Sequence, residues 1–208
     1  MTADPIKEYE NLFQFLSEYG VVAVTDNAFP SVTGFVVGQP VKGSWWSHPL
    51  AHTIFAVNEM LEEHRDVLTM KLISRKVTFV HRSIWNHVYS VVTAGDAWQM
   101  AGLSTAAQRL LKTIEKRGII DTNRLESVVG VKPGDVAREL ELRLLIHARQ
   151  VHTESGSHAK ILEAWDSWAN RVGLKDREID LQTAKEFLEQ RVKGLNDKFD
   201  ARAKLPWQ

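Results

Sequence analysis

The chain contains no cysteine among its 208 residues. This absence excludes disulfide bonds, zinc–thiolate sites, iron–sulfur clusters and a cysteine nucleophile. The chain also lacks any apolar run close to the roughly 20 residues that a membrane-spanning helix needs. Its first residues, Met1–Pro5, include an aspartate and do not resemble a signal peptide. We therefore expect a cytoplasmic protein that has no membrane partner.

The chain has no excess of charge of either sign, with 26 basic and 26 acidic residues. Residues 1–97 carry 7 basic and 10 acidic groups, a net charge of −3, whereas residues 98–208 carry 19 and 16, a net charge of +3. Proteins that bind mainly through phosphate contacts usually show a stronger basic excess. Net charge alone therefore does not favour nucleic-acid binding.

Several common ligand-binding motifs are missing as well. The sequence holds no phosphate-binding glycine loop, no dinucleotide-binding fingerprint and no calcium-binding EF-hand loop. What is present is ordinary for a folded protein, with 44% hydrophobic and 25% charged residues. The length is sufficient for one large domain or two small ones.

Residues 1–97 are predicted to form a mixed α+β unit. Apolar residues at helical spacing predict a helix over 5–19 and another from Pro49 to about residue 64. The branched runs Val67–Ile73 and Val77–Val80 are joined by a short polar link, which predicts a β-hairpin.

Residues 98–208 are predicted to form a mainly helical unit. Ser104 is placed to cap a helix that ends at Gly118, and Thr122 to cap a short second helix that ends at Gly130. Pro133 can open a third helix, and residues 145–153 alternate in part, as a strand does.

Two further helices are predicted beyond this strand. The first begins at Ser157 and carries an apolar stripe that includes Trp165 and Trp168. The last covers residues 181–201, where leucines recur at intervals of seven. This last helix is expected to dock on the protein's own body, and a homodimer contact through residues 181–201 is the alternative. The predicted fold class is therefore α+β, with units at 1–97 and 98–208.

Residues 104–154 resemble a winged helix-turn-helix in the order of their predicted elements. The residues that carry the resemblance are Leu110, Leu111, Ile114, Gly118, Leu125, Gly130, Val136, Leu140 and Leu144. The whole chain is also similar to a group of uncharacterised bacterial proteins with a GSWW-type loop and an HTESG-type turn, a similarity that implies no activity.

The winged-helix resemblance implies a DNA-reading module whose third helix enters the major groove. The candidate DNA contacts are Lys132, Arg138, Arg143 and Arg149. Glu139 and Glu141 lie between the two arginines of the third helix, and carboxylates that face phosphates are repelled. The alternative is therefore a packing or protein-contact module.

The segment Gly43–His52, the tryptophan loop, is the best candidate for a ligand site. Trp45 and Trp46 are adjacent, and neighbouring residues of a regular element do not share one face. One indole can anchor the core while the other faces a cleft and stacks on a planar ligand. The candidate ligand-binding residues are Trp45, Trp46, His48 and His52, with His48 as a candidate acid or base. The alternative is that both indoles clamp the fold and His48 satisfies local backbone groups.

The histidines do not form a metal-binding pattern. His48 and His52 are four residues apart, but Pro49 lies between them and no glutamate follows His48. Strand alternation places His147 and His152 on opposite faces. We therefore expect neither a metal nor a cofactor.

The sequence leaves three functions open. The leading hypothesis is a DNA-associated winged-helix protein, with a regulatory role, that binds double-stranded DNA. The second is an enzyme that acts on a nucleobase-like planar substrate at the tryptophan loop. The third is a protein-interaction or assembly module. Whether the chain is an enzyme is not decided by its sequence.

Overall fold

The computed structural model describes residues 4–41, 43–122, 133–152, 158–175 and 179–208. The helices are α1 (Pro5–Tyr19), α2 (Val32–Val37), α3 (Ala51–Glu63), α4 (Trp85–Val92), α5 (Ala97–Met100), α6 (Thr105–Arg117), α7 (Pro133–Leu142), α8 (Trp165–Arg171) and α9 (Leu181–Phe199). The strands are β1 (Val21–Ala23), β2 (Val67–Ile73), β3 (Lys76–His81), β4 (Ile119–Asp121), β5 (His147–His152) and β6 (His158–Glu163). Short 3₁₀ turns cover Trp45–Ser47 and Arg82–Ile84.

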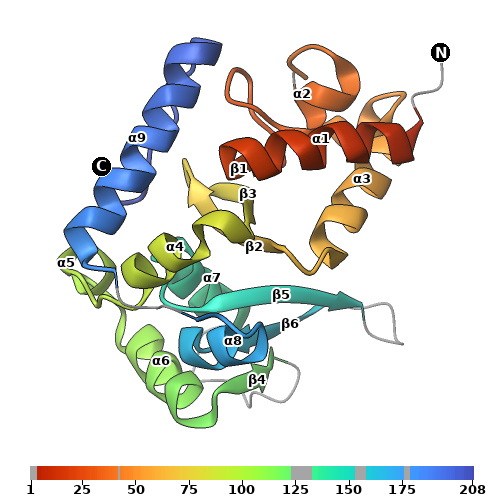
Figure 1. Ribbon diagram of the computed structural model, residues 1–208. Coiled ribbons are helices and arrows are strands. Elements are labelled where there is room, and N and C mark those ends of the chain that lie inside the picture. Colours follow the sequence, from red (N-terminus) through yellow and green to blue (C-terminus); the bar gives the residue numbers. More distant parts are fainter. Residues whose placement is uncertain (1–3, 42, 123–132, 153–157, 176–178) are drawn as a thin grey trace.

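These elements confirm the α+β class, with helices around two small antiparallel sheets (Figure 1). Within the described residues, no helix combines the length and the apolar character needed to cross a membrane.

The first sheet has the strand order β1–β3–β2 and divides the N-terminal half into two layers. Residues of one face, such as Val22 and Phe79, pack with the buried sides of α1, α2 and α3. Residues of the other face, such as Val21 and Val80, pack towards α4 and α9. Ser31 caps the start of α2, because its side chain accepts a hydrogen bond from Gly34 N.

The second sheet has the order β4–β6–β5, so that β6 is its central strand. One face packs against α6 and α7 through Ile120, Leu162 and Ala148, which lie opposite one another across the strands. The other face is partly covered by α8, whose Trp165 contacts His147 of β5. The sheet thus separates a hydrophobic cluster on the α6–α7 side from a second, more polar side.

A third hydrophobic cluster joins the two sheets. It contains Val80 and Trp85 from the N-terminal half, Trp165 and Trp168 from the C-terminal half, and the buried side of α9. Trp85 and Trp168 meet edge to face, with ring centroids 5.1 Å apart. The last helix therefore docks on the protein's own body, against α4 (Figure 1). The division into units 1–97 and 98–208 stays a prediction.

The helix predicted from Ser157 onward is wrong in its first part. Residues 158–163 form strand β6, which pairs with both β4 and β5, and the helix begins only at Trp165. The stripe of Ile161 and Trp165 is compatible with helical spacing, but the two residues belong to different elements. The short second helix predicted from Thr122 to Gly130 falls almost wholly outside the described residues.

Candidate functional sites

The tryptophan loop places its two indoles in a stack. The rings of Trp45 and Trp46 lie with centroids 4.0 Å apart and planes inclined by 23°. Trp45 is half-buried and packs on the cluster formed by α1, α2 and α3, whereas Trp46 is 64% exposed. Phe55 of α3, itself 38% exposed, lies 5.8 Å from Trp46 between ring centroids. The loop therefore anchors one indole and presents the other to solvent.

The two histidines of this loop have different environments. His48 Nδ1 accepts a hydrogen bond from the backbone N–H of Leu50 at 3.1 Å, just before α3. His52 is exposed in the first turn of α3. His48 thus serves the backbone-capping role that sequence analysis gave as its alternative, and this bond occupies one of its ring nitrogens. In the parts of the chain that the structure describes, no three histidine or carboxylate side chains gather as a metal site would require.

Helix α7 uses its carboxylates internally. Glu139 accepts hydrogen bonds from Ser104 N at 2.8 Å and Ser104 Oγ at 2.7 Å, at the start of α6. Glu141 pairs with Lys71 of β2 at 2.8 Å and with Lys160 of β6. Both carboxylates are therefore engaged inside the protein and do not stand free on the outer face of α7.

The predicted DNA contacts differ in whether their side chains are exposed. Arg138 on α7 and Arg149 on β5 are exposed. Arg143 instead donates from Nη1 to the carbonyl oxygens of Trp98 and Gln99, at 3.0 and 3.2 Å, and ties the end of α7 to α5. Lys132 lies outside the described residues. Of the four residues predicted to contact DNA, Arg138 and Arg149 are therefore the two that the structure shows exposed on the surface.

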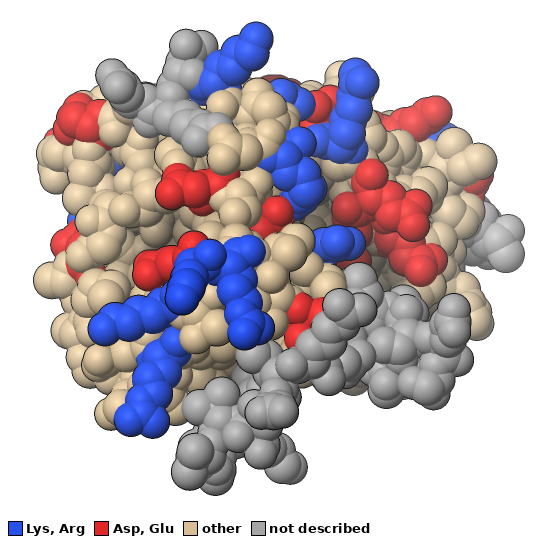
Figure 2. All heavy atoms as spheres, turned by 90° about the horizontal axis from the view of Figure 1, so that it is seen from below, with Lys and Arg blue, Asp and Glu red and all other residues tan. Residues whose placement is uncertain are grey.

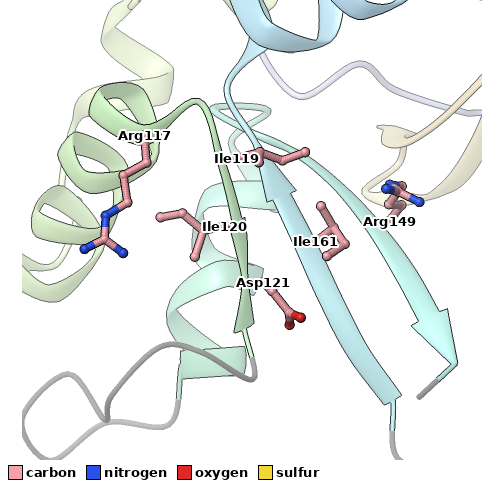
Figure 3. Close-up of a pocket in the computed structure, with 6 residues that line it drawn as sticks. All are labelled: Arg117, Ile119, Ile120, Asp121, Arg149 and Ile161. Atoms are coloured by element: carbon pink, nitrogen blue, oxygen red, sulfur yellow. The ribbon is translucent and has the colours of Figure 1, made fainter. Parts of the chain in front are cut away.

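A groove of about 400 Å³ lies beside the second sheet. It is lined by Arg117, Ile119, Ile120, Asp121, Arg149 and Ile161. Asp121, Ile161 and Arg149 are cross-strand neighbours on β4, β6 and β5. Arg117 and Arg149 come from opposite sides of the groove, with the isoleucines between them (Figure 3). The groove thus combines isoleucine side chains with a guanidinium at each side and the carboxylate of Asp121.

A buried ionic network lies on the same face of the sheet, where α8 packs. Glu163 accepts hydrogen bonds from Arg171 Nε at 2.9 Å and Nη2 at 2.7 Å, and its Oε2 lies 3.1 Å from His147 Nδ1. Burial by itself would raise the pKa of Glu163, but the bonds from Arg171 and His147 outweigh it and lower this pKa to about 2. The carboxylate therefore stays charged and holds α8 on the sheet.

Sequence analysis missed the basic side of α6. This helix carries Arg109, Lys112, Lys116 and Arg117, all exposed, with Glu115 as its only acidic residue. Lysine and arginine side chains gather in one group in the view from below, on the side where α6 lies (Figure 2). The signal in the sequence is four cations within the nine residues 109–117, whereas the winged-helix resemblance implies DNA contacts on the third helix.

Comparison with known proteins gives one finding. A protein-family model described as AlkZ related matches residues 6–204, nearly the whole chain. No curated protein and no solved structure matches the chain.

Proposed function

We propose that this chain, which belongs to the AlkZ-related family, is a DNA-associated protein whose partner is double-stranded DNA. The family match over residues 6–204 is the observation that carries this proposal, because AlkZ is a DNA-repair protein. The proposal concerns DNA association and leaves open whether the chain is regulatory or catalytic.

The topology of the C-terminal half supports a winged-helix module. Helix α6, strand β4, helix α7 and the β5–β6 hairpin follow one another in that order, with the sheet order β4–β6–β5. Helices α6 and α7 pack on one face of this sheet through a common hydrophobic cluster. A winged helix uses its third helix and hairpin to approach DNA, which in this chain corresponds to α7 and β5–β6.

Arg138 and Arg149 are the proposed DNA contacts on α7 and β5, with Lys132 as a further predicted one. Each phosphate contact that is lost should weaken binding and reduce its dependence on salt. The pairing of Glu141 with Lys71 and Lys160 supports this assignment, because these two cations offset the negative charge of one of the two carboxylates. Arg143 is assigned a structural role.

Fluorescence anisotropy with a labelled 20-base-pair duplex at low salt tests the proposal. The full chain should bind, and Arg138→Ala with Arg149→Ala should weaken binding by about tenfold and lower the salt slope by about 1.8. The control variant carries Lys7→Ala and Lys193→Ala, which remove two exposed cations on α1 and α9. It should bind the duplex as tightly as the wild type does. If the wild type shows no measurable affinity for duplex DNA at low salt, the proposal fails.

The tryptophan loop supports a second candidate function, binding of a planar nucleobase-like group at Trp46. The supporting observation is that Trp46 is 64% exposed while it is held by a stack on Trp45. An unpaired base that stacks on an indole gains about 1–3 kcal/mol. Titration of intrinsic fluorescence with single nucleosides and short single strands, compared between wild type and Trp46→Ala, tests this. Identical quenching in the two proteins would contradict it.

The homodimer through residues 181–201 stays a prediction. The apolar side of α9 packs on α4, so a dimer would need the outward side of this helix. Sedimentation velocity of the intact chain over a range of concentrations decides between monomer and dimer.

A further inference from the structure

We infer that DNA is held by α6 as well as by α7, and that the outward basic face of α6 follows the phosphate backbone. This inference rests on the proposed DNA association, and it names a surface that the winged-helix resemblance does not. The basic face of α6 consists of Arg109, Lys112 and Lys116.

The basic face lies directly opposite the buried side of its helix. At 3.6 residues per turn, Arg109, Lys112 and Lys116 lie within about 60° of one another around the helix axis. The buried residues of α6 are Ala107, Leu110, Leu111 and Ile114, and they point the other way into the cluster shared with α7. The three cations therefore point away from the protein body and are all accessible to one partner.

Within the described residues, these cations form no ion pair. Elsewhere in the described residues, exposed or half-exposed cations often pair with carboxylates, as Lys76 does with Asp26 and Arg171 does with Glu163. None of the ion pairs in the described part of the chain involves a cation of α6. Glu115, the one acidic residue of the helix, is set about 100° away from Lys116 around the axis. The positive charge of this face is therefore not compensated locally.

The spacing of the face suits a nucleic-acid strand. Arg109 and Lys116 are seven residues apart, which corresponds to a rise of about 10 Å along α6. Phosphates along one strand of duplex DNA advance about 3.4 Å each along the axis. The row therefore covers about three such steps along the duplex axis, so its three cations can each contact a different phosphate of one strand. A row of cations with no paired carboxylate is complementary in charge to a phosphate backbone.

The test compares two triple variants of the full chain for binding to the labelled duplex over a series of NaCl concentrations. The first carries Arg109→Gln, Lys112→Gln and Lys116→Gln, and the control carries Lys7→Gln, Lys193→Gln and Arg202→Gln. Both lose three exposed cations, so their net charges are equal. The α6 variant should lose at least about tenfold in affinity, and its salt slope should fall by about 2.7. The control should stay within about twofold of the wild type.

A second measurement does not depend on substitution. Lysine-reactive labelling of the wild-type chain, read by mass spectrometry, should show Lys112 and Lys116 protected when the duplex is bound, while Lys193 stays reactive. Melting curves of all three proteins check that the substitutions leave the fold intact. If the α6 variant unfolds, protection of Lys112 and Lys116 alone decides the inference.

The outcomes separate this inference from the proposed function. If the wild type binds DNA, and neither the α6 variant nor the labelling of Lys112 and Lys116 responds, the basic face is not a DNA contact although the DNA association stands. If the wild type binds no DNA, both proposals fail. If the face instead binds anionic vesicles or an acidic peptide, and DNA binding is unaffected by its loss, its partner is of another class and the inference is overturned.

Discussion

At the scale of single residues, the surroundings decide which charged side chains remain for a partner. Arg138, Arg143 and Arg149 are equivalent as letters in the sequence, yet Arg143 is occupied by two backbone carbonyls and the other two are exposed. A sequence alone cannot make this distinction, because the acceptors of Arg143 lie more than 40 residues away.

Glu163 gives a prediction at this scale. Its pKa in the folded protein is about 2, below the ordinary value of 4.5, because the bonds from Arg171 and His147 outweigh burial. The pairing therefore stabilises the fold fully above about pH 4.5, and this contribution is lost as the pH falls from 4.5 towards 2. Glu163→Gln should lower the free energy of unfolding by about 2 kcal/mol at pH 7.

Urea denaturation of the two proteins between pH 7 and pH 3 checks this prediction. The difference in unfolding free energy should be constant at neutral pH and should narrow below pH 4.5. A control, Glu186→Gln on the exposed surface of α9, should change stability by less than about 0.5 kcal/mol. A gap between wild type and Glu163→Gln that does not change with pH would contradict the electrostatic explanation.

The two neighbouring tryptophans provide a second prediction. Trp45 is half-buried against the α1–α3 cluster, so Trp45→Ala should lower stability by about 2 kcal/mol. Trp46 is largely exposed, and its replacement removes mainly the stack on Trp45. Trp46→Ala should therefore lower the free energy of unfolding by no more than about 1 kcal/mol. Chemical denaturation followed by circular dichroism measures both. Equal losses in the two variants would show that both indoles serve the core.

At the scale of elements, local signals predicted helices well and sheet pairing poorly. Ser104 caps the start of α6 and Gly118 ends it, as the sequence predicts, because caps act within four residues. The sequence pattern predicts a helix where strand β6 lies, since the pairing of this strand depends on partners 6 to 16 residues away in β5 and 40 to 44 residues away in β4. The three-residue strand β4 and the four-residue helix α5 were too short to show a period.

The end of α6 gives the prediction that belongs to this scale. Gly118 ends the helix with φ at +77°, a conformation that side chains disfavour, and an added Cβ would lie 2.7 Å from Ser167 Oγ of α8. Gly118→Ala should therefore lower the free energy of unfolding by about 1 kcal/mol or more. Gly194→Ala in α9 is the matched control, because its Cβ meets nothing within 4 Å. In this control the free energy of unfolding should rise by up to about 1 kcal/mol.

Thermal melts of the two alanine variants compare these positions directly. Opposite shifts of the melting temperature are expected, downward for Gly118→Ala and upward for Gly194→Ala. If both variants melt at the same temperature, the left-handed backbone at Gly118 does not constrain the junction between α6 and α8.

At the scale of the whole molecule, the two sheets are linked by a shared core. Glu141 bridges Lys71 of the first sheet and Lys160 of the second, and the cluster around Trp85 and Trp168 joins residues from both halves. The sequence does not indicate this connection, because its pattern predicts separate units at 1–97 and 98–208. The helix α9 contributes to the link, since it follows the second sheet in the chain but packs on α4 of the first half.

The shared core predicts that both halves unfold in one cooperative transition. Leu188 on α9 is 2% exposed within this cluster, so Leu188→Ala should lower the unfolding free energy by about 2–5 kcal/mol. Hydrogen exchange should then report the same loss of protection for amides of β3 in the first sheet and β6 in the second, because each opens only by global unfolding. Gln190→Ala, on the exposed side of α9, should change neither. If Leu188→Ala lowers protection in β3 but leaves β6 unchanged, the two halves unfold separately and the prediction of one cooperative transition is wrong.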